Sequence, residues 1–90
     1  MENNEVIGAG EARLNITYKG QQGDLPDAVL YDLEDQEVRR IVLEALVSGV
    51  PGIDPDENPD ITDFVIDRFP AHEGVPYNRL SMRPKTPFGS

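Results

Sequence analysis

The residue types that most often carry enzyme chemistry are sparse in this chain of 90 residues. It has no cysteine and a single histidine, which excludes disulfides, thiolate metal sites and cysteine nucleophiles. His72 stands in a loop with Gly74 and Pro76 and has no evident serine or aspartate partner for a catalytic triad. It also has no second histidine with which to hold a metal. We therefore expect no catalytic residue and no metal site.

Two short motifs resemble ligand-binding loops but lack their defining residues. Residues 54–60 imitate the first half of a calcium loop, but the sixth position is Pro59 instead of glycine and the twelfth is Val65 instead of glutamate. Gly20 and Gly23 are not followed by the lysine and serine or threonine of a phosphate loop. None of the seventeen carboxylates lies in an apolar setting that would mark an acid–base pair. The sequence thus predicts a protein that is not an enzyme and needs no cofactor.

The net charge of −9 is unevenly placed. Residues 1–70 hold five basic and sixteen acidic side chains, whereas residues 71–90 hold three basic and one acidic. An acidic body repels nucleic acid and anionic membranes and matches a basic partner surface; the other interpretation is that the acidity only maintains solubility. There is no apolar run of the ~20 residues that span a bilayer and no signal peptide in residues 1–10, so we expect a cytoplasmic protein.

The first half of the chain predicts a hairpin followed by a helix. Leu14, Ile16 and Tyr18 alternate with polar residues over 12–19, which is typical of a strand with one wet face. A Gly-containing turn at 20–24 and a short apolar run at 28–31 complete an antiparallel hairpin. From about residue 34 the apolar residues recur at the spacing of an α-helix. They form one apolar stripe, which consists of Val38, Ile41, Val42, Ala45 and Leu46.

The ends of the predicted helix carry recognisable signals. Asp32 or Asp35 can cap the first N–H groups. Gly49 is the expected residue of positive φ after the last turn, and Pro51 prevents the helix from continuing.

Two strands are predicted in the second half, at 61–69 and 79–83. In the first, Thr62, Phe64 and Ile66 share one face, while Val65 and its polar neighbours share the other. The predicted organisation is a mobile N-terminal arm at 1–11, an α+β domain at 12–83 and an extended C-terminal tail at 84–90. One helix and about four strands must form two layers, with the helix across one face of the sheet.

This order of elements resembles the β-grasp fold of ubiquitin and its relatives. The turn Gly49-Val50-Pro51 is similar to the glycine–aliphatic–proline turn that closes the ubiquitin helix. The final strand, which ends at Arg83, leads into a basic tail that reaches Gly89. The chain looks most like the compact, divergent ubiquitin-like modifiers of bacteria.

The resemblance implies a modifier that is joined to target proteins through a C-terminal glycine. Its partners would be an activating enzyme, a conjugating enzyme and a processing or deconjugating peptidase. Gly89 would be the reacting residue after removal of Ser90, and Arg83 and Lys85 would steer the tail into an acidic channel. The chain departs from the family in having Phe88 where a second glycine is usual, and Gly89-Ser90 could instead be a cloning remnant.

Further roles for single residues follow from their types. Phe88, a large aromatic in the tail, is expected to anchor in a partner pocket, or else to fold back on the domain. Val65 could belong to an exposed recognition patch, as in ubiquitin, or lie under a loop. Two other functions stay open: a non-covalent acidic interaction module, and a sulfur carrier of the same fold that uses a C-terminal thiocarboxylate.

Overall fold

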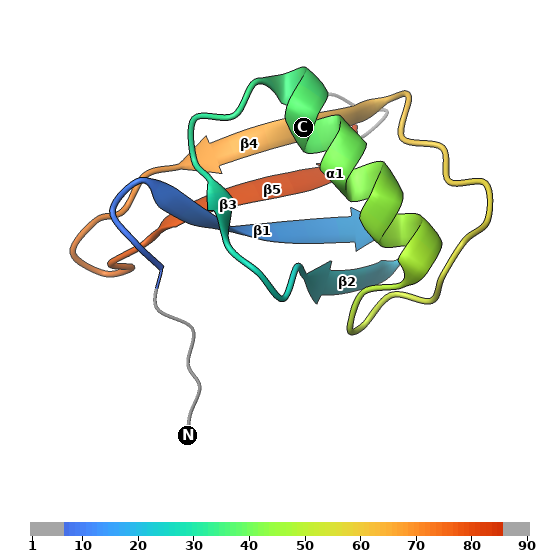
Figure 1. Cartoon of the computed structure of the whole chain (residues 1–90), viewed down its shortest axis with the longest axis horizontal. Helices are drawn as coiled ribbons and strands as arrows, with labels where there is room; N and C mark the ends of the chain where they lie inside the picture. The colour runs from blue at the N-terminus through green and yellow to red at the C-terminus, as the bar shows by residue number, and fades with distance from the viewer. Residues whose placement is uncertain (1–6, 86–90) are drawn as a thin grey trace.

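The computed structural model describes residues 7–85, which form one sheet and one helix (Figure 1). The elements are β1 (Glu11–Tyr18), β2 (Gln21–Asp24), β3 (Val29–Leu30), α1 (Asp35–Ser48), β4 (Phe64–Phe69) and β5 (Asn78–Pro84). Figure 1 shows α1 lying diagonally across one face of the sheet, as the amphipathic pattern predicted.

The sheet is mixed, and its strand order is β2-β1-β5-β4. The central pair, β1 and β5, is parallel, with Ala12 opposite Asn78 and Ile16 opposite Met82. β2 and β4 flank this pair as antiparallel neighbours, and the two-residue β3 pairs with the start of β1. A hairpin, a crossing helix and a returning strand parallel to the first make this a β-grasp fold, which confirms the predicted fold class.

The core lies between the helix and the inner face of the sheet. Alternate residues of β1 are buried from Ala12 to Tyr18, and Leu80 and Met82 of β5 lie beside them. The helix contributes the buried side chains of Val38, Val42 and Leu46, which recur at intervals of four residues as the predicted stripe requires. Ile41 and Ala45, the other members of that stripe, pack against this core and are partly buried.

The helix ends where predicted but is capped differently at its start. Gly49 takes φ 96° and its N–H donates to the Ala45 carbonyl, as expected for a residue after the last turn. The predicted cap by Asp32 or Asp35 is wrong, because Glu34 occupies the cap position and no side chain caps the helix. The Asp35 carboxylate instead accepts a hydrogen bond from Arg68 at 2.8 Å.

The first hairpin turns earlier than predicted. Residues 21–24, expected to be the turn, form β2, and the actual turn is Lys19-Gly20, with φ of 51° and 78°. Positive φ at both central positions is the type I′ geometry that matches the twist of a hairpin. The predicted second strand is present only as the short β3, which continues the same edge of the sheet.

The end of the long connection after the helix is held against α1. β4 begins at Phe64, three residues later than predicted, because the Phe64 N–H donates back to the Ile61 carbonyl in a turn. The guanidinium of Arg39 on the helix donates to the carbonyls of Ile61 and Phe64 at 3.0 and 2.7 Å. These bonds hold the turn against α1 and so fix where β4 enters the sheet.

Candidate interaction face of the sheet

The face of the sheet away from the helix, here called the open face, carries the alternate side chains that the core does not use. Because β1 and β5 run parallel and in register, Arg13 lies beside Arg79 and Asn15 beside Ser81. β2 adds Gln22 and Asp24 at one edge. At the other edge β4 adds Val65, Asp67 and Phe69. This face is therefore polar and basic in its middle, although the chain as a whole is acidic.

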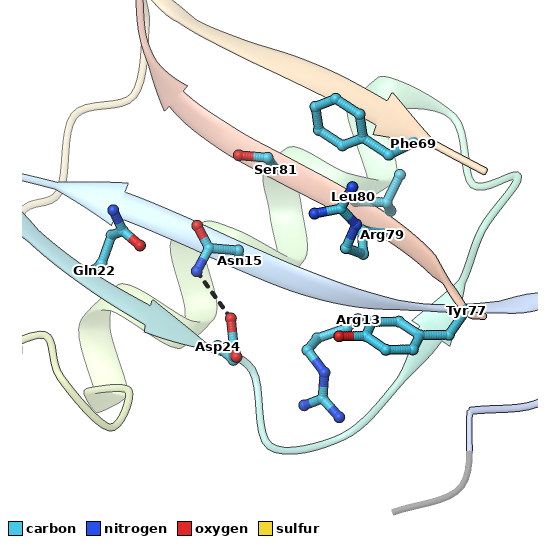
Figure 2. A pocket seen from close by; sticks show the side chains of 9 residues that line it. All are labelled: Arg13, Asn15, Gln22, Asp24, Phe69, Tyr77, Arg79, Leu80 and Ser81. Atoms are coloured by element: carbon cyan, nitrogen blue, oxygen red, sulfur yellow. Dashed lines mark hydrogen bonds between the residues drawn. The ribbon is translucent and has the colours of Figure 1, made fainter. Parts of the chain in front are cut away.

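A pocket of about 330 Å³ lies on the open face. We call it the arginine pocket; its lining residues are Arg13, Asn15, Gln22, Asp24, Phe69, Tyr77, Arg79, Leu80 and Ser81. Figure 2 shows the Arg79 guanidinium directed toward the middle of the pocket, across from the side chains of Asn15 and Ser81. The pocket thus brings together residues from β1, β2, β4, β5 and the segment that joins β4 to β5.

Two arginine–aromatic contacts shape one side of this pocket. The Arg79 guanidinium carbon lies 4.9 Å from the centre of the Phe69 ring, and that of Arg13 lies 5.7 Å from the Tyr77 ring. Such distances are typical of cation–π contacts. Both contacts place a guanidinium beside an aromatic face. The Nε of Arg79 is buried and has no hydrogen-bond partner among the residues that the structure describes.

The opposite side of the pocket is formed by uncharged donors and one carboxylate. The Asn15 side chain donates to Asp24 at 2.8 Å and to the Gly23 carbonyl at 3.4 Å, and Figure 2 draws the first of these bonds. Ser81 adds a hydroxyl. This set of groups offers hydrogen-bond donors to an anion.

The predicted site residues fall in three places. Val65 is half-buried on the open face, opposite Arg83. Arg83 belongs to β5, and its Nε donates to Asp67 at 2.7 Å. Lys85 is exposed, and its backbone N–H donates to the Asp63 carbonyl at 3.1 Å. The remaining predicted residues, Phe88, Gly89 and Ser90, lie outside the described residues, as do residues 1–6 of the predicted N-terminal arm.

The acidic loop after the helix has structural partners of its own. Asp56 accepts hydrogen bonds from the Tyr18 hydroxyl at 2.5 Å and the Lys19 ammonium at 3.1 Å. These bonds, the Tyr18 one foremost, lower the pKa of Asp56 to about 2. The same contact with Asp56 raises the pKa of Tyr18 and that of Lys19. Hydrogen bonds from Thr62 lower the pKa of Asp60. Asp56 and Asp60 thus fasten this acidic loop to the hairpin and to itself.

The solvent side of the helix has a smaller apolar surface. Leu43 and Val47, one turn apart, are 37% and 50% exposed and line a hollow with Glu44 and Ser48. Over residues 7–85, no helix has both the length and the apolar character needed to span a membrane. The same residues contain no group of three or more side chains suited to hold a metal ion.

Arg13, Phe69, Tyr77 and Arg79 were not among the site residues predicted from the sequence. In the sequence the two arginines are ordinary outward positions of alternating strands, and only the parallel register of β1 and β5 brings them together. The excess of basic residues after residue 70 was the one signal that pointed toward this region. Comparison with known proteins adds no assignment, since no protein-family model, curated protein or solved structure matches the chain.

Proposed function

We propose that this chain is a ubiquitin-like protein modifier, joined to target amines through Gly89 after a peptidase removes Ser90. The observation that supports the proposal is the β-grasp topology, in which the central strand β5 is the last element of the sheet. The described sheet and core are complete by Pro84. The proposal requires residues 86–90 to enter the active site of a partner enzyme.

The proposed chemistry takes place on partner enzymes. An activating enzyme would join the Gly89 carboxylate to the adenylate of ATP and release pyrophosphate. A cysteine thiolate would then displace AMP to form a thioester. A target lysine amine would attack that thioester, form an isopeptide bond and release the thiol. The lack of a Cβ on Gly89 would ease approach to the reacting carbonyl, and Lys85 would add positive charge where the tail leaves the sheet.

The test is mass spectrometry of N-terminally tagged protein, expressed in its native host and purified under denaturing conditions. Trypsin cleaves after Lys85, so a conjugated lysine would retain the four-residue remnant Thr-Pro-Phe-Gly. Finding this remnant on other proteins supports a modifier. If only the unconjugated chain is recovered from the host, with no remnant on any protein, the proposal is refuted.

Three variants make this test specific. Deleting Gly89 and Ser90 together should abolish the adducts, whereas deleting Ser90 alone should preserve them without the peptidase. The chain has only two lysines, Lys19 and Lys85. The double variant Lys19→Arg/Lys85→Arg therefore has no side-chain amine of its own and still yields the same tryptic remnant, so its adducts must come from other proteins. A sulfur carrier would instead show exchange of oxygen for sulfur at the terminal carboxylate in the intact mass.

A further inference from the structure

The Arg79 guanidinium differs from the other arginines in its surroundings. Hydrogen bonds to carbonyl or carboxylate oxygens are made by Arg39, Arg40, Arg68 and Arg83. Arg79 is partly buried and has a ring contact with Phe69, and its buried Nε has no hydrogen-bond partner within residues 7–85. A buried donor without an acceptor is costly. A ligand whose acceptor reaches this Nε–H therefore removes a cost that the free protein carries.

We propose that the arginine pocket binds an aspartate or glutamate side chain of an extended peptide segment in a partner protein. The planar guanidinium offers parallel N–H donors that match the two oxygens of a carboxylate. The contact with Phe69 already restricts the Arg79 side chain, so less conformational entropy is lost when a ligand binds. Ser81, which lies across the pocket from Arg79, offers a further donor, and Arg13 also lines the pocket.

The charges in the pocket favour a carboxylate over a phosphate. Asp24 lies in the lining and accepts from Asn15 at 2.8 Å, so it would repel a doubly charged phosphate more than a singly charged carboxylate. The chain as a whole is strongly acidic, whereas the lining of the arginine pocket holds two arginines and one aspartate. An anionic group is thus drawn to this place on the surface and repelled elsewhere.

The shape of the site favours a peptide over a small molecule. The pocket is partly open to solvent, and Phe69 at its edge is 39% exposed. Exposed aromatics beside an arginine are the residue types enriched at the centres of protein–protein interfaces. An apolar residue next to the bound carboxylate in the peptide would cover Phe69. This inference goes beyond the proposed function, since a modifier and a non-covalent module could use the same pocket.

The test uses purified protein and a synthetic, end-blocked peptide of alternating glutamate and leucine. Nitrogen–proton NMR spectra recorded during titration at physiological ionic strength should show shifts at the Arg79 Nε–H and at the amides of Asn15, Tyr77 and Ser81. Arg79→Gln should weaken binding about tenfold or more, because a charge-assisted hydrogen-bonded pair is lost. Arg79→Lys should also weaken binding, since it keeps the charge but loses the planar donors.

Two matched controls make the result specific. Arg40→Gln removes an arginine from the solvent side of the helix and should leave the affinity unchanged. A peptide in which glutamine replaces glutamate should not bind. The spectra themselves report whether each variant is folded.

Several outcomes would overturn the proposal. These are equal binding by Arg79→Gln, equal binding of the glutamine peptide, or shifts confined to the helix. Tighter binding of inorganic phosphate than of the peptide would overturn the ligand class. If the same resonances shift when the protein concentration is raised without peptide, the occupant of the pocket is a second copy of this chain instead. No conjugating enzyme is present, so the result does not depend on whether adducts form in the host.

Discussion

Replacing Gly23 with alanine should destabilise the fold, because β2 and the turn after the helix touch backbone to backbone. A Cβ on Gly23 would lie 2.2 Å from the Pro51 carbonyl oxygen, where 3.4–4 Å is ordinary contact. The approach is reciprocal, since a Cβ on Gly52 would lie 2.3 Å from the Gln22 carbonyl oxygen. No flexible side chain is available to move, so the two segments must separate by roughly 1 Å or more.

The expected magnitude follows from the cost of overpacking. Forcing extra volume into a packed contact destabilises the fold by about 1–3 kcal/mol. Alanine has less conformational freedom than glycine in the unfolded chain, which stabilises the fold by about 0.4–1 kcal/mol and offsets part of this loss. A net loss of about 1–2 kcal/mol in the free energy of unfolding corresponds to a fall in Tm of roughly 4–16 °C for a domain of this size. Thermal and urea denaturation followed by circular dichroism would measure it.

Gly10→Ala is the matched control. A Cβ at Gly10 meets no atom within 4 Å, and its φ is not in the left-handed region. This variant carries the same change in the unfolded chain without the clash, so we expect it to be neutral or slightly stabilised. If Gly23→Ala and Gly10→Ala have equal stability, the close approach of β2 to the turn at Pro51 is wrong.

The remaining predictions concern two polar contacts. The pKa of Asp56 is lowered from 3.8 to about 2 in the folded state, so its contribution to stability is complete above about pH 4 and is lost as the pH falls through 2. Asp56→Asn should flatten the pH dependence of urea midpoints between pH 4 and 2, and Tyr18→Phe should shift that dependence upward in pH; an unchanged profile for both would contradict this assignment. Arg68 donates at 2.8 Å to the carbonyls of Tyr31 and Leu33 as well as to Asp35, so Arg68→Met should cost about 1.5–3 kcal/mol in urea denaturation. Arg40→Met, which removes exposed ion pairs on the helix, should change stability by less than about 0.5 kcal/mol, and equal effects of the two arginine variants would refute the anchoring role of Arg68.

The parts of the fold that were predictable from the sequence are those set by the spacing of apolar residues along the chain. The alternation Leu14, Ile16, Tyr18 gave the first strand, and the stripe that begins at Val38 gave the helix, because burial against one partner layer decides both. β2 was missed because Gln21–Asp24 is polar and contains Gly23, which the sequence offers as a turn residue. The structure uses that glycine for close contact with the turn at Pro51 instead.

The candidate site was less predictable than the fold. No local motif distinguishes Arg79 from any other polar residue on the wet face of a strand. Its importance comes from the register that places it beside Arg13 and from the stacking on Phe69, which lies on another strand. The alternation of apolar and polar residues identifies the face of the strand on which a residue lies. It does not identify which strand will be the neighbour in the sheet.

The parallel pairing of β1 with β5 also constrains how the domain can form during synthesis. Ala12 cannot pair with Asn78, and the centre of the sheet cannot form, until β5 has been synthesised. β5 leaves the ribosome after every other described element. Until then the hairpin and helix have only part of their core, since Leu80 and Met82 are still missing. Contacts so distant in sequence slow folding. The nascent chain therefore presents an open strand edge and an unfilled apolar face until its last strand is made, a period in which chaperone binding would protect it.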